Sequence, residues 1–310
     1  MQSFFVLPGQ YEDLARDEVV AISKSYDSKT RFKVHPRLVI LDTKVPWKKI
    51  AKRATFVRNC GYILDTFDDI SKIDLSIPKP RSFVCRTINL STKKLSPSLL
   101  ERQAGAVLKK KLDTKVSLSN PEVVIYLIIT NSKQYIGYAD SKIEPKMPVK
   151  TIKHPHELDL KLSRCIVNLS GLKEGDTLLD PFCGTGTILL QAEAMKIKAI
   201  GIDYDEIMCK ITRKNLQVNG FSSKIINSTY HEMQNIRNKV DAIVTDLPYG
   251  ISSKSSISPK KLIKDFASMV PKRKKLVMVY KKGLDIPEMD KAKKYEIYRH
   301  KSLTRVIAVR

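Results

Sequence analysis

The segment LLDPFCGTGTILL, residues 178–190, constrains the fold more than any other part of the chain. It reads as a short apolar strand, an acidic turn at Asp180 and Pro181, a Gly-Thr-Gly loop, and an apolar helix that begins near Thr187. Glycine lets the backbone turn tightly, and the free N–H groups of a helix N-terminus point toward the same loop. A strand that ends in such a loop is typical of the ligand-binding edge of an open α/β sheet.

The residues of this loop argue against one class of ligand. Gly184, Thr185 and Gly186 could begin a dinucleotide fingerprint, but Leu189 stands where a third Gly or Ala belongs, which disfavours a pyrophosphate. A carboxylate at Asp180 would also repel phosphates and attract an ammonium or sulfonium group.

Two further predicted strands end in acidic residues. Residues 198–202 form an apolar run followed by Asp203, an acid that can accept hydrogen bonds from ribose hydroxyls. Residues 241–246 form another buried-type strand, which ends in Asp-Leu-Pro-Tyr at 246–249. The three strand ends in this order are far more specific than any one of them.

Together these segments resemble the class I S-adenosylmethionine-dependent methyltransferases that modify exocyclic amino groups of nucleobases. The resemblance rests on the acidic-Pro-x-Cys-Gly-Thr-Gly loop, the acid after the second strand, and the Asp-x-Pro-Tyr tetrad, in which Leu247 replaces the usual first proline. After the third strand the family often has an acid, whereas this chain has Asn, Ser and Thr at 227–229, so the adenine contact is unassigned. The resemblance implies an α/β fold with a Rossmann-like methyltransferase domain over residues 157–310.

The resemblance also implies catalytic roles for the tetrad. The Asp246 carboxylate and the Leu247 carbonyl would accept hydrogen bonds from the amine, Pro248 would shape the turn, and Tyr249 would stack on a flipped base.

The same resemblance implies a site for the cofactor, S-adenosylmethionine. Asp180 would lie near its charged amino-acid end, and Asp203 on its ribose. Cys183 is expected to pack in the loop rather than act as a nucleophile, because no cationic neighbour is near it in sequence. The predicted cofactor-binding residues are Asp180, Pro181, Cys183, Gly184, Thr185, Gly186, Thr187, Asp203, Tyr204 and Asp246.

The amino-terminal part predicts two smaller α/β regions. Alternating strands and helices over residues 1–68 predict a ferredoxin-like domain. Residues 69–145 resemble the THUMP domain, an RNA-binding module of tRNA-modifying enzymes, most specifically in the turn VSLSNPE at 116–122. Residues 146–156 are basic, contain two prolines, and are predicted to be a linker. The helix before that turn ends in Lys109, Lys110 and Lys111, which suit a helix C-terminus and could equally bind RNA phosphates.

The net charge of +24 is unevenly distributed. Residues 1–150 hold 27 Lys and Arg against 15 Asp and Glu, a net +12; residues 151–250 hold 12 of each; residues 251–310 hold 17 against 5, again +12. A neutral cofactor region between basic flanks predicts a polyanionic partner, nucleic acid before membrane.

Other classes of protein are disfavoured. The five cysteines contain no C-x-x-C pair, and His154 and His156 have no third ligand nearby, so no metal site is predicted. No apolar run approaches the roughly 20 residues of a membrane span, and no secretory signal is present. A cytoplasmic protein is expected.

The whole chain resembles the archaeal and eukaryotic tRNA (guanine-N2)-methyltransferases that act on guanosine 10. Related enzymes act on guanosine 6 or on ribosomal RNA, and some require a small zinc-binding activator protein. The addition of one methyl group or two is left open. Two alternatives are an RNA-binding protein with a vestigial cofactor site, which the intact acids argue against, and a DNA amine methyltransferase, which the THUMP-like region disfavours. The expected substrate is therefore tRNA and not DNA.

Overall fold

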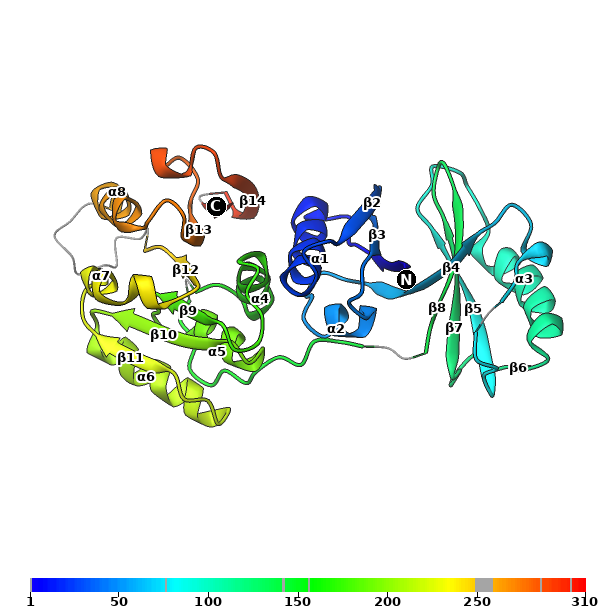
Figure 1. Ribbon diagram of the computed structural model, residues 1–310, viewed down its shortest axis with the longest axis horizontal. Helices are drawn as coiled ribbons and strands as arrows, with labels where there is room; N and C mark the ends of the chain where they lie inside the picture. The colour runs from blue at the N-terminus through cyan, green and yellow to red at the C-terminus, as the bar shows by residue number, and fades with distance from the viewer. Residues whose placement is uncertain are drawn as a thin grey trace. The chain divides into compact units, whose positions relative to one another are not determined.

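The computed structural model describes residues 2–75, 77–140, 143–155, 157–248, 259–284, 286–301 and 303–310 (Figure 1). Contacts divide the chain into two compact units. The first comprises residues 1–23, 27–52 and 56–144, and the second comprises residues 24–26, 53–55 and 145–310. Within the described ranges, no helix is both long enough and apolar enough to cross a membrane.

The first half of the first unit has a ferredoxin-like arrangement. Its strands lie in the antiparallel order β2-β3-β1-β4, with α1 and α2 as the connecting helices. Strand β2 was not expected, because four of its five residues are exposed and none is fully buried, so it lacks the alternation of a half-buried strand. The elements are β1 (Gln2–Val6), α1 (Glu12–Tyr26), β2 (Arg31–His35), β3 (Leu38–Asp42), α2 (Trp47–Ala51) and β4 (Asn59–Thr66).

The same sheet continues into the second half of this unit. Strand β4 pairs with β8, and the order goes on through β7 and β5 to β6, so strands from both sides of residue 68 share one sheet of eight strands. Helix α3 packs its buried Leu108 against Phe83 and Ile125. The division of this region at residue 68 stays a prediction. The elements are η1 (Ile70–Lys72), β5 (Ser82–Asn89), α3 (Pro97–Leu112), β6 (Lys115–Val116), β7 (Val123–Ile129) and β8 (Gln134–Ala139).

The second unit is built on a seven-stranded sheet in the order β11-β10-β9-β12-β13-β15-β14. The first five are parallel, and β15 is antiparallel to both of its neighbours. The elements are α4 (Leu160–Leu169), β9 (Thr177–Asp180), α5 (Thr187–Ala194), β10 (Lys198–Asp203), α6 (Glu206–Val218), β11 (Lys224–Asn227), η2 (Tyr230–Glu232), α7 (Met233–Ile236), η3 (Arg237–Lys239), β12 (Ala242–Asp246), α8 (Pro259–Met269), β13 (Lys275–Lys281), η4 (Pro287–Met289), β14 (Lys293–His300) and β15 (Leu303–Val309).

This topology is the expected Rossmann-like fold, and it places the ligand crevice. The central strands β9, β12 and β13 are almost wholly buried, as strands covered by helices on both faces must be. The chain moves outward from β9 to β11 and then returns to add β12 on the other side of β9. Ligands bind at such a reversal, beyond the carboxyl ends of the strands. Asp180, Asp203 and Asp246 stand at the ends of β9, β10 and β12, so the fold brings the three predicted acids to this edge.

Candidate active site

The loop between β9 and α5, residues 181–186, uses its two glycines differently. Gly184 and Gly186 both have left-handed backbones, with φ of +49° and +82°. A Cβ at Gly186 would lie 2.8 Å from Cγ2 of Thr212 on α6, whereas a Cβ at Gly184 would meet nothing within 4 Å. Gly186 therefore permits close packing against α6, and Gly184 borders open space that a ligand could occupy.

Helix α6 and the end of β10 hold this loop in place. Thr212 donates from Oγ1 to the Gly184 carbonyl at 2.6 Å, and Asn215 donates from Nδ2 to the Thr185 carbonyl at 3.0 Å. The Asp203 carboxylate accepts the N–H of Gly184 at 2.8 Å and that of Asp205 at 2.9 Å. Each Asp203 oxygen keeps acceptor capacity beyond these bonds, so the side chain can still receive hydroxyl groups of a ligand.

Asp180, the last residue of β9, is buried and forms two hydrogen bonds within the fold. It is 1% exposed, and its Oδ1 accepts hydrogen bonds from Thr245 Oγ1 at 2.6 Å and from the Phe182 N–H at 3.1 Å. Burial raises the pKa of Asp180 to about 7. The side chain therefore joins β9 to β12, and its predicted place near the cofactor's amino-acid end stays a prediction.

Asp246 ends β12 with a buried oxygen that has no partner. Its Oδ1 is inaccessible to solvent and accepts no hydrogen bond from the described residues. Burial raises the pKa of Asp246 to about 7, and the guanidinium of Arg305, itself 2% exposed, opposes that rise. An unsatisfied buried acceptor is costly in a folded protein and is common where a ligand supplies the missing partner.

The residues after Asp246 continue the pairing of β12. The Leu247 N–H donates to the Val279 carbonyl at 2.9 Å, and the Leu247 side chain lies in the core at 1% exposure. Pro248 is partly buried. The predicted stacking residue Tyr249 lies outside the described residues.

The remaining predicted cofactor residues fall into three environments. Cys183 and Pro181 are buried, and burial raises the pKa of the Cys183 thiol well above its usual value, which disfavours a nucleophilic thiolate. Tyr204 is 50% exposed beside Asp203. The hydroxyls of Thr185 and Thr187 are engaged on the side of the loop that faces residues 150–157.

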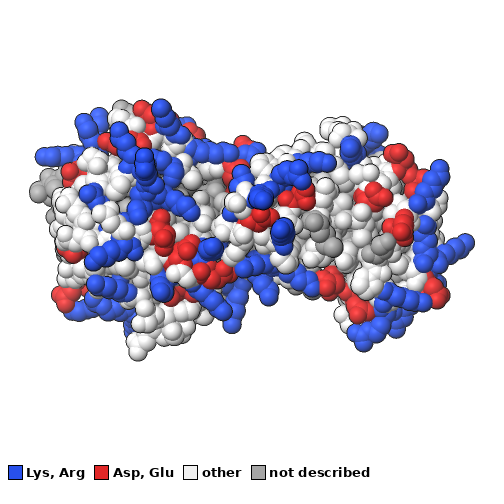
Figure 2. All heavy atoms as spheres, viewed as in Figure 1, with Lys and Arg blue, Asp and Glu red and all other residues white. Residues whose placement is uncertain are grey.

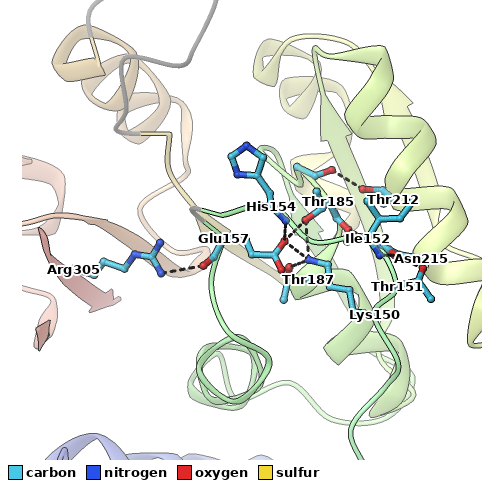
Figure 3. A network of polar contacts seen from close by, with 11 residues as sticks. Lys150, Thr151, Ile152, His154, Glu157, Thr185, Thr187, Thr212, Asn215 and Arg305 are labelled. Atoms are coloured by element: carbon cyan, nitrogen blue, oxygen red, sulfur yellow. Dashed lines mark hydrogen bonds and ion pairs between the residues drawn. The ribbon is translucent and has the colours of Figure 1, made fainter. Parts of the chain in front are cut away.

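Residues 149–155 and 157, here called the brace segment, hold the loop through a buried ion pair (Figure 3). Lys150 Nζ lies 2.5 Å from Glu157 and donates to the hydroxyls of Thr185, at 2.7 Å, and Thr187. Thr185 in turn donates to Glu157 at 2.6 Å. Burial lowers the pKa of Lys150; burial alone would raise that of Glu157, but hydrogen bonds from Lys150 and Thr185 hold it below its usual value.

Asn215 of α6 and Asn219, which caps the carboxyl end of that helix, bind the main chain of the brace segment. Asn215 accepts the Ile152 N–H at 3.0 Å and donates to the Ile152 carbonyl at 2.9 Å, and Asn219 makes the same pair of bonds with Val149. Residues 146–156 were predicted to be a linker, and the loop-positioning contacts of Lys150, Glu157 and Asn215 were not predicted. A lysine and a glutamate seven residues apart in a proline-containing stretch carry no periodic signal that would have identified them.

The predicted RNA-contacting lysines of α3 divide into two kinds. All three are exposed, but Lys111 also donates from Nζ to the Ile73 carbonyl at 2.7 Å. Lys111 therefore ties the helix to the preceding loop, and all three remain predicted RNA contacts. In the ranges that the structure describes, no group of three or more His, Cys, Asp or Glu side chains is arranged to hold a metal ion, and His156 lies outside those ranges.

Comparison with known proteins decides the family. The profile described as "RMKL-like, methyltransferase domain" matches residues 149–302. A tRNA (guanine(10)-N2)-dimethyltransferase of Methanothermobacter thermautotrophicus is 33% identical, over 85% of this chain and 84% of the relative. The chain belongs to the tRNA (guanine(10)-N2)-dimethyltransferase family. A member from Methanocaldococcus jannaschii is 28% identical over 98% of both chains.

Other comparisons agree on the fold. The crystal structure of TrmN from Thermus thermophilus superposes with a TM-score of 0.56 at 17% identity, over 99% of this chain and 98% of that one, which shows a common fold. A second profile, described as "DNA methylase", matches residues 75–214, a range that ends before Asp246. The chain is therefore a methyltransferase, and its cofactor is S-adenosylmethionine.

The geometry of the site fits this cofactor, which supplies an activated methyl group when bound. The open face at Gly184 leaves room beside the loop, and Asp203 retains acceptors for ribose hydroxyls. The buried Oδ1 of Asp246 lacks a hydrogen-bond partner among the described residues, and an amine is a donor of the kind it lacks. These are features of the residues themselves, so the fit does not depend on the family.

The two loop glycines provide a test of which side the cofactor occupies. Gly186→Ala is expected to lower the free energy of unfolding by about 2–4 kcal/mol, because left-handed strain adds to a collision with Thr212. Gly184→Ala is expected to cost only about 1–2 kcal/mol, from backbone strain alone, while weakening cofactor binding more than tenfold. Urea unfolding and calorimetric titration with S-adenosylmethionine measure both quantities. Unchanged cofactor affinity in Gly184→Ala would show that the cofactor lies elsewhere.

Activity is expected to rise with pH through the pKa of Asp246. The ionised carboxylate is the better acceptor, and its pKa of about 7 in the folded chain puts the rise of kcat/KM near neutrality rather than near the ordinary value of 3.8. Asp180 has a similar pKa, so Asp180→Asn is the control, and it should retain the rising limb. A profile that is flat from about pH 5 to 8 would contradict an ionised Asp246 as the acceptor.

Proposed function

We propose that this protein transfers methyl groups from S-adenosylmethionine to the N2 amine of guanosine 10 in tRNA. The buried, unpartnered Oδ1 of Asp246, at the sheet edge that also carries Asp203 and the Gly184 loop, is the observation that supports this most directly. The names of the related archaeal enzymes support the choice of base and position.

The chemistry requires what Asp246 and its neighbours offer. The lone pair of an aryl amine is delocalised into the ring, so the nitrogen is a poor nucleophile. Two acceptors on its hydrogens, Asp246 Oδ1 and the Leu247 carbonyl, favour a pyramidal nitrogen with a localised lone pair. The proton that leaves the nitrogen can pass to Asp246, whose pKa near 7 suits that transfer. Positioning the amine against the methyl group of the cofactor then supplies most of the remaining rate enhancement, and no metal is needed.

The first unit is proposed to bind the RNA. Residues 1–68 are its proposed ferredoxin-like part and residues 69–145 its THUMP domain. In the second unit, residues 157–310 are the proposed methyltransferase domain, which follows the segment 146–156. The exposed Lys109 and Lys110 are proposed phosphate contacts. A tRNA substrate also favours a cytoplasmic location, and a small zinc-binding activator remains a predicted partner.

A second target is supported by other relatives. Named similar proteins include a tRNA (guanine(6)-N2)-methyltransferase of Methanocaldococcus jannaschii, 25% identical over 66% of this chain, and a bovine U6 snRNA (guanine-N(2))-methyltransferase, 25% identical over 70%. The shared chemistry is N2 methylation of guanine, so the base is better supported than its position.

The experiment incubates the purified protein with labelled S-adenosylmethionine and unmodified tRNA transcripts, followed by digestion and mass spectrometry. N2-methylguanosine or its dimethyl form is expected at position 10, and none in a matched transcript with adenosine there. Product at another guanosine would replace the proposed position. Bound cofactor with no methylated nucleoside, with or without added cell extract to supply an activator, would overturn the proposed reaction.

A further inference from the structure

Exposed basic residues are concentrated in the last third of the second unit. Figure 2 shows Lys and Arg side chains in groups scattered over the visible face, among mostly other residues. Between residues 259 and 310 the exposed ones include two in the turn before β13, two at its end, and two near the end of β14: Lys272, Arg273, Lys281, Lys282, Arg299 and Lys301. Their positions along the sheet differ, and strand register determines which of them lie near Asp246.

The pairing of β12 with β13 places Lys281 and Lys282 at the carboxyl edge of the parallel strands, where Asp246 lies. Asp246 pairs with Val279 of β13, so Lys281 lies two residues, or about 7 Å, further toward the carboxyl edge of the parallel strands. The Lys282 N–H donates to the Thr304 carbonyl at 2.8 Å, at the start of β15.

The β14–β15 hairpin closes at this same edge. Strand β15 is antiparallel to β13, and His300 at the end of β14 pairs with Leu303. Arg299 and Lys301 are therefore beside the edge where Asp246 lies. We call Lys281, Lys282, Arg299 and Lys301 the catalytic-edge cations.

The catalytic-edge cations are available to a polyanion. Lys282 pairs with Glu296 at 2.7 Å and Arg299 with Asp159 at 3.5 Å, but both pairs are exposed, and such pairs contribute only about 0–1 kcal/mol. Lys281 and Lys301 are exposed and make no ion pair with any described residue. A phosphate could therefore bind these side chains at little cost to the fold.

Lys272 and Arg273 provide a matched comparison at the other edge of the same sheet. They lie in the turn before β13, and β13 begins at Lys275, so they are at the opposite end of that strand from Lys281. Both are exposed. Lys272 and Arg273 therefore carry the same charge as Lys281 and Lys301 but lie at the sheet edge away from Asp246.

We propose that the catalytic-edge cations bind the phosphates next to the target guanosine and so hold the RNA backbone beside Asp246. This inference rests on the proposed function and extends it to a substrate-binding surface on the methyltransferase unit itself. A guanine delivered to Asp246 brings its flanking phosphates to the same sheet edge, where the register places these exposed cations. Phosphate contacts of this kind position a nucleic acid without reading its sequence.

The test compares Lys281→Gln/Lys301→Gln with Lys272→Gln/Arg273→Gln, two variants that lose the same charge. We expect the first to lower tRNA affinity and kcat/KM for tRNA about tenfold, with KM for S-adenosylmethionine unchanged. Its slope of log affinity against log salt should fall by about 1.4–1.8, because two phosphate contacts are lost. The second variant should keep tRNA affinity and kcat/KM for tRNA within about twofold of the wild-type values.

Equal losses of tRNA affinity in the two variants would show a general charge effect and overturn the proposal. Unchanged tRNA affinity in the first variant would also overturn it. Affinity is measured by fluorescence anisotropy with labelled tRNA transcript and needs no methyl transfer. The comparison therefore stays valid if the protein binds tRNA and cofactor but methylates nothing, a result that would instead contradict the proposed reaction.

Discussion

Asp246→Ala is expected to lower kcat for methyl transfer about 10²- to 10⁴-fold, the range typical of losing a positioned proton acceptor. The buried Oδ1 of Asp246 has no partner in the described structure, so its hydrogen-bonding capacity is open for the guanine amine. S-adenosylmethionine should still bind, because the Gly184 loop and Asp203 keep their hydrogen bonds. Single-turnover kinetics with saturating cofactor and tRNA, together with a cofactor titration, measure the two effects separately.

The neutral isostere Asp246→Asn should not destabilise the protein above about pH 7. The pKa of Asp246 is raised by burial from 3.8 to about 7, so the ionised form is disfavoured in the folded chain. The stability contributed by the protonated acid is present below the unfolded pKa and is lost as the pH rises through about 7. Asp246→Asn should therefore unfold at a higher urea concentration than the wild type above that pH. Normal turnover in Asp246→Ala with cofactor bound would refute the proposed mechanism.

Lys150→Met is expected to lower the free energy of unfolding by about 3–5 kcal/mol, because removing one partner leaves Glu157 as an uncompensated, largely buried charge. The Lys150 and Glu157 side chains are only 1% and 18% exposed, so solvent replaces little of their interaction. The bonds to Thr185 and Thr187 are lost at the same time. Affinity for S-adenosylmethionine should fall with stability, since these bonds position the loop at 181–186, which we predict to bind the cofactor.

Two controls distinguish the effect of breaking the buried ion pair from the effect of removing any lysine. Lys210 and Glu206 form an exposed pair at 2.8 Å, with 67% and 65% exposure, so Lys210→Met should cost well under about 1 kcal/mol. The double variant Lys150→Met/Glu157→Gln should recover part of the stability, because no buried charge is left unpaired. Urea unfolding measures all of these variants. If Lys150→Met lowered the free energy of unfolding no more than Lys210→Met, the brace segment would not hold the loop.

The course of the backbone was predictable where burial leaves a pattern. The loop at 178–190, the apolar strands before Asp203 and Asp246, and helix α3 all occur where the periodicity and glycines placed them. Strand β2 was missed because an exposed edge strand has no buried face, so hydrophobic alternation is absent.

The sequence by itself determined that three acidic strand ends follow one another in a Rossmann-like order, because strand patterns and glycine turns are local properties. Tertiary structure alone decided what surrounds each acid. Thr245 binds Asp180 from another strand, and Oδ1 of Asp246 is buried without a hydrogen-bond partner among the described residues. Lys150 reaches the cofactor loop from a segment without regular secondary structure. Such contacts join residues far apart in the chain and depend on distance and burial, which leave no periodic trace in a sequence.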